Sequence, residues 1–264
     1  MKRYISFLLV ICIGVICMAG CKGKTESRVL FDKDKEYRIL FIGNSFTDYN
    51  NLANDIFKPL CETAGYNVVV DTVTRGAYIL ELFANSADAK GALVDQHLQE
   101  HKYDVVILQE QSNRPISDYE SFRRGVHGLA EKVKENGADL YLYETWGYKT
   151  GNQSLASFGG STAEMARRLS NAYMKVAKEV DAKIIHAGIA MLDVYVNHKD
   201  DIELYQPDLY HPSYEGSTLV AYTMLCTIFG VDVRNVDYSS GSRMRDKIMK
   251  QAAYDAAIAQ KYII

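Results

Sequence analysis

The sequence predicts an α/β protein: a single doubly wound, flavodoxin-like sheet of five parallel strands with helices on both faces. Three observations lead to this prediction. Short apolar segments rich in Val, Ile and Leu alternate with longer amphipathic segments, and the alternation repeats five times. The short segments mostly lack polar residues at every second position, as expected of parallel strands that are buried on both faces. No internal repeat or interdomain linker interrupts the pattern, so one domain accounts for it.

The order of the elements follows from these patterns. Five segments are predicted as strands: 37–43, 67–73, 104–108, 139–143 and 183–186. Five helical patterns accompany them: 51–64, 90–101, 119–135, 161–180 and 214–229. Residues 242–262 are expected to form one more helix, packed on the outside. With right-handed crossovers, the functional site of such a sheet lies at the carboxyl ends of its strands.

The first twenty residues differ from the rest of the chain. Two basic residues, Lys2 and Arg3, precede the uncharged run 5–18, which is too short to span a bilayer but has the length of a signal-peptide core. The run leads into Met-Ala-Gly-Cys at 18–21, which resembles the lipobox of bacterial lipoproteins, where the cysteine becomes the lipidated first residue. The resemblance implies an exported lipoprotein, anchored through Cys21 and facing the periplasm or the cell exterior. The alternative is a short membrane anchor with an incidental cysteine.

The chain therefore divides into a signal peptide (1–20), a polar tether (21–36) and one folded domain (37–264). With Cys21 assigned to lipidation and the signal peptide removed, the remaining cysteines are Cys61 and Cys226. Export would permit a disulfide between them. Both lie within apolar helical patterns, where a free cysteine behaves as a small buried hydrophobic residue, so buried thiols are favoured.

The charge balance argues against a nucleic-acid partner. Thirty basic and thirty-three acidic side chains give a formal net charge of −3. There is no basic excess to neutralise a phosphate backbone.

The segment 43–48, Gly-Asn-Ser-Phe-Thr-Asp, directly follows the first predicted strand. A tight turn there would place Ser45 at the carboxyl edge of the sheet, where a serine can act as a nucleophile. It is not the nucleophile elbow of the α/β-hydrolases, which has glycine at the position of Thr47. The alternative is a helix cap, because serine, threonine and aspartate are all good capping residues.

A second motif, Asp-Leu-Tyr-His-Pro at 208–212, precedes a strongly apolar helical pattern. Pro212 disfavours a helical conformation at the preceding residue, so His211 is expected at the start of that helix. Asp208, three residues earlier, can fix the tautomer of the imidazole and raise its basicity, which makes His211 a candidate general base. The alternative is an ordinary hydrogen bond at the surface.

Together these motifs resemble those of the SGNH/GDSL hydrolase superfamily. That family has a serine turn after the first strand, a glycine after the second, a polar amide after the third, and Asp-x-x-His near the end. The corresponding residues here are Ser45, Gly76, Gln109 or Asn113, and the pair Asp208 and His211. Two positions depart from the family pattern: Asn44 replaces the usual aspartate, and the third motif lacks Gly-x-Asn-Asp.

The resemblance implies a Ser-His-Asp mechanism through an acyl-enzyme, with Ser45 as nucleophile, His211 as base and Asp208 as its partner. It also implies an oxyanion hole built from the Ser45 backbone, Gly76 and one side-chain amide. Gly76 could instead serve only to make a turn. Spacing favours Asn113 as the amide donor. Rigidity at the end of the third strand favours Gln109, which is our expectation.

Other polar and aromatic residues carry weaker signals. His186 ends the fifth predicted strand, where a structural role is expected. A metal site combining Glu110, Asp48 and His211 is not required by any spacing, so no metal and no cofactor are expected. Tyr143, Trp146 and Tyr148 follow the fourth strand, and they could either anchor a loop or stack on a substrate.

The sequence thus predicts a serine esterase that removes small acyl groups, such as acetyl, from carbohydrates or glycosides. Its expected partners are that small ester or acylated carbohydrate and, through the lipid alone, a membrane. The alternative is a non-catalytic lipoprotein that binds a glycan in the same pocket. A metal-dependent phosphoesterase is a third, more distant possibility. The oligomeric state cannot be read from the sequence.

Overall fold

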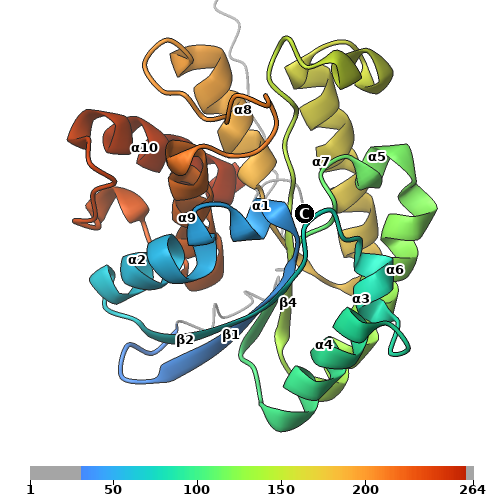
Figure 1. The fold of residues 1–264 in the computed structure, drawn as a ribbon. Helices are drawn as coiled ribbons and strands as arrows, with labels where there is room; N and C mark the ends of the chain where they lie inside the picture. Colours follow the sequence, from blue (N-terminus) through green and yellow to red (C-terminus); the bar gives the residue numbers. More distant parts are fainter. Residues whose placement is uncertain (1–30, 260–264) are drawn as a thin grey trace, which may run out of the picture.

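The fold is a five-stranded parallel sheet with helices on both faces, as predicted (Figure 1). It is seen in a computed structural model, which describes residues 31–259; the predicted signal peptide and Cys21 lie outside the described residues. The strand order is β2-β1-β3-β4-β5, and every neighbouring pair is parallel. The strands are β1 (Glu36–Gly43), β2 (Asn67–Thr74), β3 (Val105–Leu108), β4 (Asp139–Tyr143) and β5 (Lys183–Ile185).

The helices connect the strands and extend beyond them. Those before β4 are α1 (Ser45–Asp48), η1 (Tyr49–Asn51), η2 (Leu52–Phe57), α2 (Lys58–Thr63), α3 (Leu80–Ala84), α4 (Ala89–Glu100), α5 (Arg114–Ser117) and α6 (Tyr119–Asn136). Those after β4 are η3 (Gln153–Phe158), α7 (Thr162–Val180), α8 (Ala187–His198), α9 (Tyr214–Phe229), η4 (Val233–Asn235) and α10 (Arg243–Ala259).

Two hydrophobic cores lie on the two faces of the sheet. Successive residues of a strand point to opposite faces, so β1 sends Ile39 and Phe41 into one core and Leu40 and Ile42 into the other. The first core is closed by α2, α8, α9 and α10, and the second by α3, α4, α6 and α7. Figure 1 shows these two groups of helices on opposite sides of the sheet. Burial on both faces explains why β1 and β3 are almost continuously apolar in sequence.

The structure adds short helices that the sequence pattern does not predict, among them α1, α3 and α5. It also differs at two longer elements. The predicted helix 51–64 begins at Leu52, because Asn50 and Asn51 have positive φ angles of 56° and 46°. Its first part, η2, is a π-helix, and α2 continues it to Thr63. The sequence pattern predicts no helix at α8, where the apolar residues do not follow a clear helical period. Its buried residues pack in the first core, so tertiary contacts determine this helix.

The two remaining cysteines have the state expected for them. Cys61 and Cys226 are free and buried. Burial raises the pKa of both thiols, which keeps them protonated and unreactive at neutral pH. The prediction of buried thiols is confirmed.

The first described residue, Phe31, packs on the domain. Its ring lies 4.7 Å from the rings of Tyr37 and Phe229, centroid to centroid. Tyr37 is at the amino-terminal end of β1, and Ser45 follows its carboxyl end. The chain therefore enters the domain at the end of the strands opposite to Ser45. Within residues 31–259, no helix is both long enough and apolar enough to cross a bilayer.

Candidate active site

The serine turn begins where β1 ends. Gly43 is the last residue of the strand, and the Asn44 side chain caps α1 by accepting a hydrogen bond from the backbone N–H of Phe46. Ser45 is the first residue of α1 and is half-buried. A Cβ atom on Gly43 would lie 2.7 Å from both Gln109 Oε1 and Thr47 Oγ1. Only glycine permits this close approach, so the turn needs it.

The Gln109 side chain holds the serine turn in place. Its Oε1 accepts hydrogen bonds from the Asn44 backbone N–H and from Thr47 Oγ1, both at 2.9 Å. Its Nε2 donates to Asn44 Oδ1 at 2.9 Å and to the Glu110 carbonyl. Both amide hydrogens are therefore used within the fold. This network also explains why threonine rather than glycine follows Phe46.

The structure brings together the three residues predicted to form a catalytic triad. His211 Nδ1 donates to Asp208 Oδ2 at 2.7 Å, which leaves Nε2 to accept a hydrogen bond from Ser45 Oγ at 2.8 Å. The His211 side chain is 10 % exposed and that of Asp208 is 37 % exposed. The three side chains thus form one continuous hydrogen-bonded chain across 166 residues of sequence.

The Asp208 carboxylate is stabilised in its ionised form. Burial alone would raise its pKa, but hydrogen bonds from the His211 ring and from the backbone N–H groups of His211 and Tyr210 outweigh burial and lower it. The turn that makes these bonds requires a positive φ of 69° at Leu209. Backbone strain of this kind is tolerated where the surroundings fix the turn.

The aromatic residues at and after the end of β4 pack against the segments that carry Ser45 and His211. Trp146 is fully buried, stacks on Phe46 at 4.3 Å, and donates its indole N–H to the Tyr210 carbonyl at 3.0 Å. It therefore contacts the residue after Ser45 and holds the residue before His211. Tyr143 and Tyr148 are also buried. Of the two roles left open for this group, the structure shows anchoring.

Gly76 lies beside the serine turn. Gly43 pairs with Thr74, and the Arg75 N–H donates to the Gly43 carbonyl at 3.2 Å, so the segment after β2 runs next to the segment after β1. Gly76 is exposed, and a Cβ there would meet no atom within 4 Å. Packing therefore does not require glycine at this position. Among the described residues, neither the Ser45 nor the Gly76 backbone N–H has a hydrogen-bond acceptor.

Asn113 has a spare donor where Gln109 has none. Its Nδ2 donates to the Tyr148 hydroxyl at 2.8 Å, and its Oδ1 accepts from Ser117 Oγ at 3.0 Å. Within residues 31–259 the second amide hydrogen of Asn113 has no acceptor, whereas both of those on Gln109 are engaged. The rigidity expected of Gln109 is present, but it serves the serine turn. Of the two amides considered, Asn113 is therefore the one with a hydrogen left to donate.

Glu110 is a buried carboxylate that connects two loops of the site. It accepts hydrogen bonds from the backbone N–H of Leu80, at the start of α3, and from that of Gln111, in the loop after β3. Burial raises the pKa of Glu110 to about 7, although these backbone bonds oppose the shift. The sequence offers no signal for this role beyond a glutamate at a strand end. Among the described residues, no three His, Cys, Asp or Glu side chains are grouped so as to hold a metal ion.

The raised pKa of Glu110 predicts a pH-dependent stability. Between its ordinary value of 4.5 and about 7, the folded protein binds more protons than the unfolded chain, so stability falls as pH rises through this window. The contribution is about 3 kcal/mol at most. Glu110→Gln keeps the side-chain shape without the charge. Urea unfolding at pH 5 and pH 7.5 should show wild type losing about 2 kcal/mol relative to Glu110→Gln. Parallel profiles would mean that Glu110 titrates normally.

His186 lies away from the triad, in a buried pair. Its Nδ1 is 3.2 Å from Glu144 Oε2, and both side chains are almost inaccessible to solvent. It occupies the N-cap position of α8, without a capping hydrogen bond from its side chain. These contacts are those of a structural histidine, as the sequence suggested.

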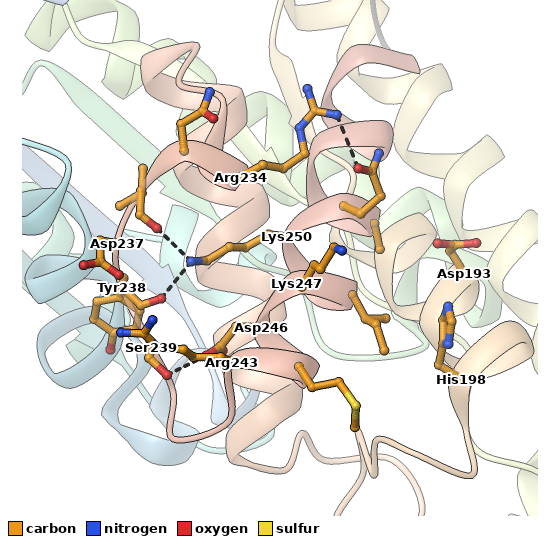
Figure 2. A pocket seen from close by; sticks show the side chains of 16 residues that line it. Asp193, His198, Arg234, Asp237, Tyr238, Ser239, Arg243, Asp246, Lys247 and Lys250 are labelled. Atoms are coloured by element: carbon orange, nitrogen blue, oxygen red, sulfur yellow. Dashed lines mark hydrogen bonds between the residues drawn. The ribbon is translucent and has the colours of Figure 1, made fainter.

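A cavity of about 780 Å³ opens elsewhere, between α8, η4 and α10 (Figure 2). None of the predicted site residues lines it. Figure 2 shows Lys250 in its wall, where Nζ donates at 2.7 Å to the carbonyls of Val236 and Tyr238. Asp246 accepts hydrogen bonds from Tyr222 and Ser239. These polar groups hold α10 to the chain around it.

Solved structures similar to this chain have the same fold. A protein from Slackia heliotrinireducens, described as a candidate SGNH hydrolase, is 31 % identical over 71 % of this chain and 96 % of its own, with a TM-score of 0.61. A DUF4886 family protein from Bacteroides uniformis is 21 % identical over 85 % of this chain and 95 % of its own, with a TM-score of 0.73. The psychrotrophic esterase EstA from Pseudoalteromonas sp. is 14 % identical over 73 % and 96 % of the two chains, with a TM-score of 0.52.

The sequence matches no protein-family model and no curated protein. The relationship therefore rests on the solved structures. The similarity to the Slackia protein extends over nearly all of that protein, at an identity that shows common descent. The chain belongs to the SGNH hydrolases.

Proposed function

We propose that this hydrolase is a serine esterase that removes small acyl groups, such as acetyl, from carbohydrates or glycosides. One observation carries the proposal: Ser45 Oγ, the His211 ring and the Asp208 carboxylate are joined by hydrogen bonds of 2.8 and 2.7 Å. A serine bonded to a histidine that is itself oriented by a carboxylate is the arrangement that activates a hydroxyl nucleophile.

The proposed reaction has two halves. Ser45 Oγ attacks the ester carbonyl carbon while His211 Nε2 takes the hydroxyl proton. The tetrahedral intermediate collapses, the C–O bond to the alcohol breaks, and His211 gives its proton to the departing alcohol. Water then attacks the acyl-enzyme with His211 as base, which releases the acid and restores Ser45. Asp208 keeps the imidazole in the required tautomer and stabilises its protonated form.

The negative charge that develops on the carbonyl oxygen needs donors that are already in place. We assign the backbone N–H groups of Ser45 and Gly76 and the free amide hydrogen of Asn113. The first two belong to neighbouring segments at the carboxyl edge of the sheet. The space beside Gly76 that a Cβ would occupy stays open to a substrate.

Two features support a carbohydrate ester as the substrate. The leader 1–20 and Cys21 indicate export, where acylated glycans are available. The Tyr210 ring is half-buried and lies 4.0 Å from the His211 ring, centroid to centroid. A tyrosine in this position can stack on a sugar and bond to its hydroxyl groups.

Release of free acid from a panel of acetylated polysaccharides and glycosides, with an activated acetate ester as reference, tests the proposal. Turnover of the reference ester and of at least one glycan acetate is expected. Glycan binding without release of acid from any ester would instead favour a non-catalytic glycan-binding lipoprotein. Loss of activity with a chelator would favour a metal-dependent phosphoesterase.

We also propose that the protein is a lipoprotein held on the membrane through Cys21. Cys21→Ser should release it into the soluble fraction, because no helix within residues 31–259 can span a bilayer. Fractionation after metabolic labelling with a fatty acid measures this. Membrane retention without label would mean that the signal segment itself remains as the anchor. Since Phe31 packs at the edge opposite to Ser45, the anchored enzyme would direct its site away from the membrane.

A further inference from the structure

The two residues after α1, Tyr49 and Asn50, contact the segment 211–213, which contains His211. The helix α1 ends at Asp48, and the chain then passes through two left-handed residues, Asn50 and Asn51. Asparagine tolerates this conformation better than most residues. The backbone is thus kinked between α1 and η2.

The Asn50 amide bridges the two halves of the site. Its Nδ2 donates to the Ser213 carbonyl at 2.9 Å and to Ser217 Oγ at 2.8 Å, with the Pro212 carbonyl at 3.3 Å. Carbonyl oxygens can only accept, so the nitrogen of the amide must face them. Asn50 therefore fixes the two residues that follow His211 to the segment that carries Ser45.

The Tyr49 ring covers one face of the imidazole. It lies parallel to the His211 ring, with a centroid distance of 4.2 Å and an interplanar angle of 14°. Such a stack restricts the rotation of the imidazole about its χ angles. The electron-rich face of a tyrosine also stabilises a cation above it. His211 becomes a cation each time it takes the serine proton.

We propose that Tyr49 and Asn50 form a positioning clamp, in which Asn50 sets the distance between Ser45 and His211 and Tyr49 holds the ring in place as it gains and loses the serine proton. The inference rests on the proposed serine esterase chemistry. Because the clamp acts on the reacting histidine and not on the substrate, its loss should lower kcat and leave KM nearly unchanged. A small activated acetate is the suitable substrate, because it has no sugar that could stack on Tyr49.

Asn50→Gly and Asn51→Gly form a matched pair. Both keep the left-handed backbone, but within residues 31–259 only Asn50 of the two bonds to α9 and its N-cap; the Asn51 side chain there accepts a single bond, from Asn54 Nδ2 at 3.4 Å. Asn50→Gly should lower kcat by about 10- to 100-fold, because a small misplacement of reacting groups has effects of this size. Asn51→Gly should keep the wild-type kcat. Asn50→Asp, of the same shape but without the donors, should show a loss at least as large.

Tyr49→Leu should lower kcat by about 3- to 10-fold, and Tyr49→Phe, which retains the ring, should recover most of that loss. Circular dichroism and thermal melts establish that each variant is folded. Equal kcat values for Asn50→Gly, Asn50→Asp and Asn51→Gly, with an active wild type, would overturn the clamp while leaving the esterase intact. A wild type that hydrolyses no ester would overturn the proposed function and the clamp with it.

Discussion

Replacing Ser45 or His211 by alanine should lower kcat/KM on an activated acetate ester by about four to six orders of magnitude while the protein stays folded. The serine supplies the attacking oxygen, and the histidine takes its proton through a 2.8 Å hydrogen bond. Because the two act as a unit, the double variant should be scarcely worse than either single variant. Steady-state kinetics measures this, with thermal melts to verify folding.

Ser154→Ala is the matched control for the nucleophile. Ser154 is exposed in the short 3-10 helix η3, and its substitution should leave the kinetics unchanged. Full activity in Ser45→Ala would exclude the serine mechanism. Additive losses in the double variant would indicate that Ser45 and His211 act in separate steps.

Asn113→Ala should lower kcat by about two to three orders of magnitude with little change in KM, since it removes a donor to the developing oxyanion. Gln109→Ala should act on stability instead. It leaves the buried Asn44 N–H and the Thr47 hydroxyl without their acceptor and removes one of the two donors to Asn44 Oδ1, which should cost about 3 to 5 kcal/mol and lower the melting temperature by about 10 °C.

The pair of variants separates the two amides. Activity and thermal stability should be lost in different proportions: mainly activity in Asn113→Ala, and mainly stability in Gln109→Ala. If Gln109→Ala melts like wild type but loses two to three orders in kcat, Gln109 is the oxyanion donor. The hydrogen bonds seen around it would then have to rearrange when substrate binds.

The fold could be predicted because its strands are buried on both faces. An apolar run such as that of β3 differs visibly from the amphipathic pattern of α6, and the alternation of the two kinds allows few topologies. The helix α8 could not be predicted in this way. Its apolar residues have no clear helical period, and its conformation depends on contacts that no local pattern encodes.

That Ser45, His211 and Asp208 lie together could also be predicted, since a parallel sheet places the residues after its strands at one edge. The hydrogen bonds of the neighbouring polar groups could not. Gln109 has the rigidity of an oxyanion donor, yet its hydrogens are used by Asn44 and the Glu110 carbonyl, a pairing across 65 residues in the first case. The hydrogen bond from Asn50 to the carbonyl of Ser213, the N-cap of α9, likewise joins residues more than 160 positions apart. Such pairings depend on the final packing and leave no mark in spacing.

The most direct test of the account is the site of reaction with a serine-directed phosphonate. An activated serine should form a covalent adduct, and peptide mapping by mass spectrometry should locate it on Ser45. Labelling should be slowed by an acetylated glycan substrate and should be lost in His211→Ala, which lacks the base that accepts the hydroxyl proton. An adduct on any other residue, or an unlabelled wild type at high probe concentration, would contradict the assignment of Ser45 as the nucleophile.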